Sequence, residues 1–287
     1  MKTTGLFTVH KFEIPIRGLN QETPIVIFGD VHRDSPNHAH GAWQYFLEHA
    51  RSLKNARFLG MGDYADGVST SERHAIKTGG FHESTLEKWE NDANDWVRRL
   101  AKEMSFMKGR LIGLLGGNHY YSFEDGTNTD MRLARELGCK FLGVSAFIRL
   151  VFSIVNIRIT YDVLAHHGTG AGRMVGGSLN RVAQMLEWAE ADLVCMGHDH
   201  KRGVVPGIPR LYLQSSQRDG KLRVKHRETK IARTGSFLAA YEDGEANYNV
   251  DAARGPCSLG HVEVWVRMRK TQSDGKIQRW LETRGVA

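Results

Sequence analysis

The 287-residue sequence has few cysteines and no long hydrophobic run. The odd number and wide spacing of its cysteines argue against a disulfide framework and against a cysteine-based zinc site. The three are Cys139, Cys195 and Cys257. The stretch nearest to a membrane span, 147–155, is interrupted by Arg149 and is shorter than the ~18–20 residues required. Residues 1–15 contain no hydrophobic block, so neither a secretory signal nor a membrane segment is expected, and we predict a cytoplasmic location.

The charge is unevenly distributed along the chain. Apolar residues make up 41% and charged residues 25%, as in soluble globular proteins. The net charge is +7, and residues 201–287 carry 17 Lys and Arg against 9 Asp and Glu. The basic character therefore belongs to the C-terminal part. It favours a polyanionic partner, although a solvated basic face is an alternative.

A short motif, Asp30-Val31-His32, directly follows the apolar run 25–28 and Gly29. Four apolar residues rich in β-branched types predict a buried strand. In open α/β sheets, ligands bind outside the carboxyl ends of the strands. A carboxylate and an imidazole two positions apart at such an end can both point at one ion.

The same arrangement recurs four times further along the chain. Each time a short apolar run leads into Asp, Asn or His. The segments are Gly62-Asp63 after 58–61, Gly117-Asn118-His119 after 111–115, His166-His167 after 163–165, and Gly197-His198-Asp199-His200 after 193–196. One histidine at a strand end can be structural, but five coordinating clusters predict a metal site.

In order and composition these motifs resemble those of the calcineurin-like metallophosphoesterase superfamily, in a compact, single-domain, bacterial or phage-type form. The match runs over about residues 24–202. The resemblance implies an α/β fold in which two β-sheets pack face to face, flanked by helices, with metals at the strand ends. We expect one domain over 1–287, comprising an N-terminal arm or hairpin (1–23), a metal-motif core (24–202) and a basic β-rich part (203–287).

The resemblance also implies a cofactor and residue roles. Two divalent metal ions are expected, and oxygen and nitrogen ligands without thiolate fit Mn, Fe or Zn, with Mn favoured. One ion is assigned to Asp30, His32 and His200, the other to Asn118, His198 and one histidine of the 166–167 pair, and Asp63 bridges both. His119 is assigned to the substrate, where it protonates the leaving oxygen or stabilises the phosphoryl group.

Two points stay open within this assignment. In the tandem His166-His167 we favour His167, next to Gly168, as the ligand. Many family members carry an acidic residue after Gly-Asn-His, whereas Tyr120 and Tyr121 follow here. The partner of His119 is therefore undefined, and Asp34 is one substitute for it.

Cationic residues suggest how a phosphate could be held. Arg33 and Arg173 flank metal motifs and are candidates for bidentate phosphate contacts, although either could be a surface arginine. In the segment 221–227, Lys and Arg alternate with other residues, which places four cations on one face of a strand. Such a row suits a nucleic-acid backbone, or it protects a sheet edge from pairing.

The remaining pattern predicts alternating helices and strands. Helices are expected over 38–51, from a capping box at Ser84 and Glu87 to about 107, over 129–137 and, after a glycine-rich turn, to about 190. Residues 67–82 are expected to form a loop. Further strands are expected over 141–152, 154–161, 192–196, 211–213, 222–227, 236–241 and 260–269.

Taken together, the sequence predicts a metal-dependent phosphoric ester hydrolase. A phosphodiesterase or nuclease acting on nucleic acid or nucleotides is favoured, because the C-terminal part is basic. A phosphomonoesterase or protein phosphatase is the alternative, and a non-catalytic scaffold on the same fold is a third. The filled ligand positions argue against the scaffold. The sequence does not define an oligomeric state.

Overall fold

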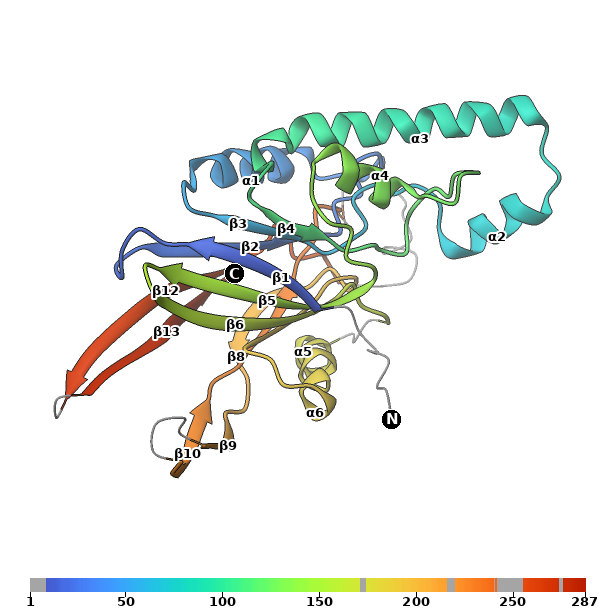
Figure 1. Ribbon diagram of the computed structural model, residues 1–287. Helices are drawn as coiled ribbons and strands as arrows, with labels where there is room; N and C mark the ends of the chain where they lie inside the picture. Colours follow the sequence, from blue (N-terminus) through green and yellow to red (C-terminus); the bar gives the residue numbers. More distant parts are fainter. Residues whose placement is uncertain (1–8, 171–173, 216–219, 240, 242–254, 274–275) are drawn as a thin grey trace, which may run out of the picture.

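The computed structural model describes residues 9–170, 174–215, 220–239, 241, 255–273 and 276–287 (Figure 1). Two large β-sheets pack face to face, and helices cover the outer face of each. The predicted α/β architecture of two sheets flanked by helices is therefore confirmed.

The first sheet has five strands in the order β13-β12-β2-β3-β4. Its strands are β2 (Glu22–Phe28), β3 (Arg57–Gly60), β4 (Leu111–Leu114), β12 (Val262–Ser273) and β13 (Lys276–Val286). β2, β3 and β4 run parallel, and β12 is antiparallel to both β2 and β13. The side chains at 25–28 are fully buried because both faces of β2 are covered.

The second sheet has six strands in the order β1-β5-β6-β7-β11-β8. Its strands are β1 (Val9–Pro15), β5 (Ser145–Ile154), β6 (Ile157–His166), β7 (Leu193–Met196), β8 (Arg202–Pro206) and β11 (Lys230–Thr234). β6, β7 and β11 run parallel. β1 pairs in parallel with β5 and not with β2, so the described part of the N-terminal segment, 9–23, is an arm that joins the second sheet, and β1 and β2 do not form a hairpin.

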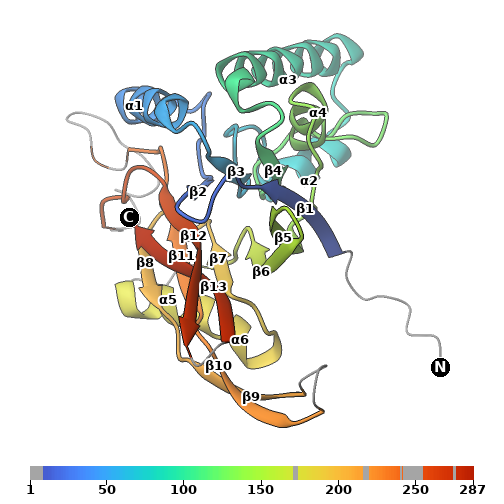
Figure 2. The ribbon, with the colours of Figure 1, turned by 60° about the vertical axis from the view of Figure 1, so that its left-hand side comes forward.

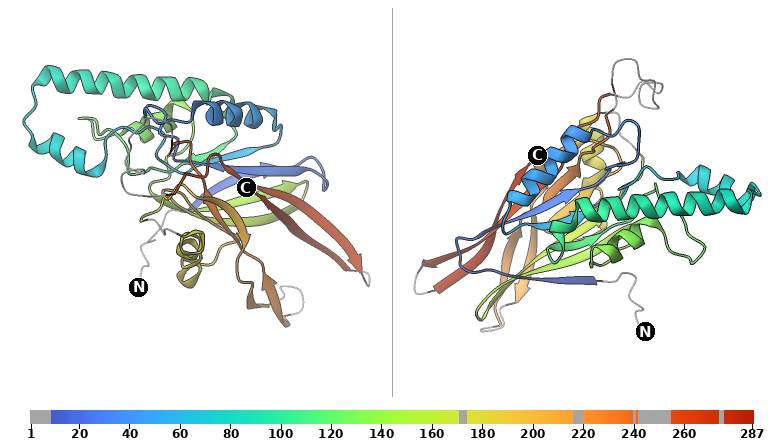
Figure 3. Two further views of the ribbon diagram at one scale, coloured as in Figure 1. Left: turned by 180° about the vertical axis from the view of Figure 1, so that it is seen from behind. Right: turned by 90° about the horizontal axis from the view of Figure 1, so that it is seen from above.

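Alternate residues along the strands point to opposite faces of the sheet and pack in different layers of the core. Ile25 and Ile27 of β2 face the second sheet, where Leu150 and Val163 belong to the same cluster. Val26 and Phe28 face the helices α1 (His40–Ser52), α3 (Glu83–Glu103) and α4 (Thr129–Glu136). On the opposite side α5 (Val175–Ala183) and α6 (Met185–Trp188) cover the second sheet. Figure 3 shows α1 and α3 lying over the sheets when the molecule is seen from above.

The region 67–82 differs from the prediction of a loop. It contains the helix α2 (Thr70–Thr78), whose capping box is formed by Ser69 and Glu72. The Ser69 hydroxyl accepts the Glu72 amide and the Glu72 carboxylate accepts the Ser69 amide. The predicted box at Ser84 and Glu87 is not used, because α3 begins two residues earlier with His82 as its N-cap. A short 3₁₀ turn, η1 (Ser105–Met107), follows α3.

The C-terminal part also differs in detail. The strand expected over 236–241 is absent from the described part of this range, and β11 precedes it. β9 (Arg210–Ser215) and β10 (Leu222–Arg227) form a separate antiparallel hairpin that projects from the body of the molecule (Figure 2). None of the helices that the structure describes is long and apolar enough to cross a membrane.

Candidate metal centre

The carboxyl ends of five strands meet at one end of the two stacked sheets. The loops after β2, β3 and β4 come from the first sheet, and those after β6 and β7 come from the second. Backbone hydrogen bonds join the loops, from Asp30 N to Gly62 O (2.9 Å) and from Gly197 N to His167 O (2.8 Å). A cavity of about 780 Å³ opens here. Its lining includes the predicted residues His32, Asp63, His119, His198 and His200.

One group of ligand-type side chains consists of Asp30, His32 and His200. One ligand atom from each lies within 4.8 Å of the others. Asp30 and His32 are buried, and His200 Nε2 lies 3.5 Å from Asp30 Oδ1. The Asp30 carboxylate also accepts the backbone amide of His198. This is the first set that the sequence assigned to one ion.

A second group consists of Asp63, His167 and His198, with Asn118 between the two imidazoles. His167 Nε2 lies 2.9 Å and His198 Nδ1 lies 2.8 Å from Asn118 Oδ1. His167 Nδ1 donates to the Met61 carbonyl (2.7 Å), which leaves Nε2 as its ligand atom.

The structure brings His167, and not His166, into the centre. His166 Nδ1 accepts the backbone amide of Gly168 in the local turn. A side chain committed to its own turn is not directed at the strand ends.

Asp63 lies between the two groups. Its Oδ2 atom is 3.3 Å from His167 Nε2 in the second group and 4.0 Å from His32 Nε2 in the first. Its other oxygen accepts the backbone amide of His119 (2.8 Å). The residue at 117 must be glycine, because an added Cβ would lie 1.9 Å from Asp63 Oδ1. Asp63 therefore lies close to imidazoles of both groups.

Backbone strain is concentrated at these residues. Six non-glycine residues in the described part of the chain have positive φ, and five of them are ligand-type residues of the two groups. They are Asp30 (49°), His32 (46°), Asp63 (51°), His198 (73°) and His200 (56°). Left-handed backbone is unfavourable for such residues and persists where the surrounding structure imposes it, often at functional sites.

One buried nitrogen atom, His32 Nε2, indicates that a cation would fit the first group. His32 Nδ1 is hydrogen-bonded to Asp66 Oδ1 (2.8 Å), whereas His32 Nε2 is buried and has no hydrogen-bond partner among the residues that the structure describes. A buried polar atom without a partner is costly. A cation held with the Asp30 and His200 side chains would engage this nitrogen. The donor set and this unpaired atom both fit a divalent metal.

The electrostatics of the centre couple its carboxylates and imidazoles. Burial alone would lower the pKa of His167, but the Asp63 carboxylate outweighs it and raises that pKa to about 9. Burial likewise opposes protonation of His200, but hydrogen bonds with Asp30 and with the Cys257 sulfur raise its pKa to about 10. Burial would raise the pKa of Asp63, yet the surrounding histidines lower it. Because the pKa values of His167 and His200 are raised, both imidazoles carry protons that an incoming cation must displace.

Metal binding at this centre is therefore expected to weaken as pH falls. The pKa values of His167 and His200 lie above 7, so at pH 7.5 both are protonated, and binding releases about two protons per chain. Titration calorimetry with Mn²⁺ in buffers of different ionisation enthalpy measures this release. An affinity that does not change between about pH 6.5 and 8.5 would contradict the expectation.

His119 lies beside the two groups without belonging to the ligand set assigned above. Its Nδ1 atom is 2.8 Å from the Asp66 carbonyl and 3.5 Å from Asp66 Oδ1. Its ring packs edge-on against His32 with 5.1 Å between the ring centroids. The Asp66 carbonyl occupies Nδ1, which leaves Nε2 for the cavity that His119 lines. A substrate held there would meet this nitrogen.

Asp66 is the acidic neighbour of His119 that the sequence did not identify. The substitute considered there, Asp34, instead accepts the backbone amides of Asp66 (2.5 Å) and Gly67 (3.3 Å). Asp34 therefore holds the loop that carries the acid. The only signal in the sequence is the position of Asp66, three residues after Asp63.

Replacing Asp66 with Asn is expected to lower turnover about 10- to 100-fold, the usual range for a residue that orients a metal ligand. The variant weakens the hydrogen bond to His32 Nδ1 and the charge beside His119. Steady-state kinetics with a small phosphodiester measures the effect. Asp95→Asn, an exposed carboxylate on α3, is the control and should match the wild type. Equal activity of the two variants would show that Asp66 has no orienting role.

Of the two predicted phosphate-binding arginines, Arg33 is described and is not directed at the centre. The Arg33 guanidinium forms a bidentate pair with Glu103 (2.9–3.1 Å), which also accepts the Trp43 indole. Its donors are thus committed to a carboxylate at the helix layer. Arg173 lies outside the described residues.

A different arginine, Arg73 on α2, supports the centre. Its guanidinium donates to the carbonyls of Asn118 (2.8 Å) and Tyr120 (3.2 Å) and stacks on the Tyr120 ring at 3.8 Å. It therefore holds the backbone on both sides of His119. Nothing in the sequence pointed to this role, because α2 itself was not predicted.

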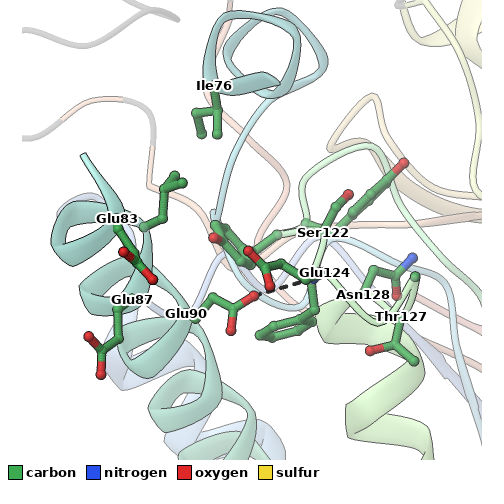
Figure 4. A pocket seen from close by; sticks show the side chains of 13 residues that line it. Ile76, Glu83, Glu87, Glu90, Ser122, Glu124, Thr127 and Asn128 are labelled. Carbon is green, nitrogen blue, oxygen red and sulfur yellow. Dashed lines mark hydrogen bonds between the residues drawn. The ribbon is translucent and has the colours of Figure 1, made fainter. Parts of the chain in front are cut away.

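A second cavity of about 720 Å³ lies between α3 and the loop 120–128 (Figure 4). It is acidic, with Glu83, Glu87 and Glu90 from α3 opposite Glu124, whose backbone amide donates to Glu90. A phosphate ester is repelled by such a surface. The cavity at the strand ends is also lined by carboxylates, but it carries the groups that could hold a cation, so it is the candidate substrate site.

Neither a protein-family model nor a curated protein matches the sequence. Solved structures similar to the chain include vacuolar protein sorting 29 from Cryptosporidium parvum, at 11% identity, a TM-score of 0.32, and 92% of this chain and 99% of that one covered. Another is a conserved protein from Streptococcus pneumoniae TIGR4 described as a predicted phosphoesterase. It has 10% identity, a TM-score of 0.32, and coverage of 91% and 99%. At these scores the similarity says nothing about the activity of this protein. The residues of the centre are the basis for a functional proposal.

Proposed function

We propose that the protein is a dinuclear metal-dependent phosphoesterase related to the calcineurin-like metallophosphoesterases. The observation that carries the proposal is the position of Asp63 between two groups of buried carboxylate and imidazole ligands. A carboxylate shared between two such groups is what a pair of ions about 3.5–4 Å apart requires.

The residues of this chain divide between the ions. Asp30, His32 and His200 would hold one, Asn118, His167 and His198 the other, and Asp63 both. Oxygen and nitrogen donors without thiolate suit Mn, Fe or Zn, and we favour Mn. Two bound ions would neutralise the phosphoryl oxygens and supply a nucleophilic hydroxide at neutral pH.

His119 would act on the leaving group. The hydrogen bond from Nδ1 to the Asp66 carbonyl fixes the tautomer and the ring orientation when the imidazole is neutral. In the protonated form Nε2 carries a proton that can pass to the departing oxygen. The Asp66 carboxylate lies 3.5 Å from Nδ1 of the same ring.

For the substrate we favour a phosphodiester, with nucleic acid or a nucleotide as its source. The β9–β10 hairpin supports this choice, because Arg223 and Lys225 share one exposed face with Tyr212. Arg227 does not extend this face, because it is paired with Asp192 (2.7 Å) and Asp162. The cationic row is therefore shorter than the sequence predicted.

A phosphomonoesterase or protein phosphatase is the second candidate, since the same ligand set can serve either ester. A non-catalytic scaffold is disfavoured by the complete and assembled set of ligand residues. A screen of the purified protein with Mn²⁺ against a small diester, a small monoester, and single- and double-stranded DNA tests the proposal. Hydrolysis that is absent for every substrate in metal-loaded protein would overturn it.

The hairpin makes a separate prediction. Changing Arg223 and Lys225 to Gln is expected to weaken DNA binding and to flatten its salt dependence by nearly one power of salt for each phosphate that the variant no longer neutralises. Hydrolysis of a small diester should not change, because the hairpin is separate from the strand-end cavity. Fluorescence anisotropy over a series of salt concentrations measures the slope.

The control removes two positive charges elsewhere, with Lys108→Gln and Arg158→Gln, both exposed. If this control lowers the slope as much as the hairpin variant, only net charge matters. If neither protein binds DNA and a monoester is cleaved faster than a diester, the phosphomonoesterase is correct.

A further inference from the structure

A third cluster of metal-type side chains lies between the last turn of α1 and the start of β12. His49 Nε2 is 2.5 Å and His261 Nε2 is 3.1 Å from the same atom, Glu263 Oε1. One ligand atom from each residue lies within 4.8 Å of the others. The cluster shares no residue with the groups at the strand ends.

The carboxylate of this cluster is buried and held in one orientation. Glu263 is 5% exposed, and its second oxygen accepts the indole N–H of Trp265 (2.6 Å). Oε1 is left for the two imidazoles. Burial would raise the pKa of Glu263, but hydrogen bonds with His261 and His49 hold it at about 2, so the group is anionic at neutral pH. In the described part of the chain no Lys or Arg pairs with it.

The imidazoles are presented by well-packed elements, and one of them is reachable from solvent. The His261 ring packs against Phe46 of α1 with 4.8 Å between centroids. The His49 side chain is 33% exposed. An ion could therefore enter from the His49 side and keep a water in a remaining coordination position.

We propose that His49, His261 and Glu263 form a mononuclear binding site for a transition-metal cation of the zinc class, separate from the dinuclear centre. Two imidazoles and one carboxylate are a set that binds zinc in proteins. Ligand atoms about 2.0–2.2 Å from a tetrahedral ion lie about 3.3 Å apart. The distance from His49 Nε2 to Glu263 Oε1, now 2.5 Å, would therefore lengthen by about 1 Å. The exposure of His49 permits that shift.

The bound ion would tie the end of α1 to β12. Aromatic contacts run from His261 to Phe46 and from Phe46 to Phe237, and the Phe237 amide donates to the Asp30 carbonyl. These rings lie between the cluster and the strand-end centre. The site would therefore have a structural role, because it joins two elements at a distance from the strand-end centre. Its loss should leave the activity of that centre unchanged.

Zinc content measured with and without His49 tests the site. The wild type, His49→Ala and the control His40→Ala, an exposed histidine in the first turn of the same helix, are equilibrated with Zn²⁺, desalted and analysed by mass spectrometry of the metal. His49→Ala is expected to bind one equivalent fewer than the other two proteins. Mn²⁺-dependent hydrolysis of a small diester should be equal in all three.

The comparison does not depend on how many ions the dinuclear centre takes, because only the difference between variants is measured. Equal zinc content in the wild type and His49→Ala would overturn the site and leave the proposed phosphoesterase untouched. An equal loss in His40→Ala would show non-specific binding to surface histidines and would also overturn it.

A second measurement guards against misfolding. Removing Glu263 leaves two imidazoles without their acceptor, so His261→Gln is the better second variant because Gln retains an amide donor for Glu263. It should also lose one equivalent and retain the circular dichroism of the wild type. Anomalous diffraction at the zinc edge should place an ion between α1 and β12. Its absence in zinc-soaked crystals would contradict the proposal.

Discussion

Replacing Asp63 with Asn is expected to empty both positions of the proposed dinuclear centre and to lower turnover by about 10³-fold or more. Each ion contributes several kcal/mol to transition-state stabilisation, and each 1.36 kcal/mol is a factor of ten in rate. Asn keeps the oxygen that accepts the His119 amide but loses the charge shared between His32 and His167. Metal analysis and hydrolysis of a small diester measure the two effects.

Asp130→Asn is the matched control for this change. Asp130 is also a fully buried carboxyl near the centre, but it accepts the Gly117 amide (3.0 Å) and belongs to neither ligand group. Burial raises the pKa of Asp130 to about 7, so replacing its carboxyl with a neutral amide changes the local charge less than the same change at Asp63. The control should keep both ions. If Asp63→Asn also retains two ions and full activity, the shared role of Asp63 is refuted.

Replacing His119 with Ala should lower turnover about 10²- to 10⁴-fold while both ions stay bound, because a general acid contributes in this range. Its ring is held by Asp66, and its assigned role is toward substrate. The loss should be largest for a diester with a poor leaving group and small for one with a nitrophenolate leaving group, which departs without a proton.

His166→Ala serves as its control, since His166 adjoins the centre but is bound into its own turn. It should keep the wild-type rate with both substrates. Loss of metal from the His119 variant would make His119 a ligand. An equal loss of rate with both leaving groups would exclude proton donation to the leaving oxygen.

Prediction from sequence succeeded for elements whose local residue pattern also determines their place in the fold. The apolar runs before Asp30, Asp63 and Asn118 are β2, β3 and β4, and their parallel pairing alone brings the following loops to one edge. Buried parallel strands have a strong apolar signal, so these elements were clear. The helix α1 was likewise visible from its apolar spacing, because one face packs on the sheet.

It failed where a residue acts through contacts distant in sequence. Arg33 lies beside a metal motif, but its pairing with Glu103, 70 residues away, turns its guanidinium to the helix layer. Arg227 continued the alternation of the hairpin strand, but Asp192 binds it. Charge patterning shows that a cation is present and says nothing about which carboxylate the fold brings to it.

The sequence by itself determined the alternation of helices and strands and the order of ligand-type residues along the chain, because hydrophobic periodicity and ligand chemistry are local properties. The packing of two sheets face to face was implied by the resemblance of the motifs to a known family. Only the tertiary structure decided that His167 and not His166 enters the centre, that Asp66 stands beside His119, and that His49 meets Glu263. Each of these depends on distances between separate elements. Side-chain direction is set by packing, which no single stretch of the chain encodes.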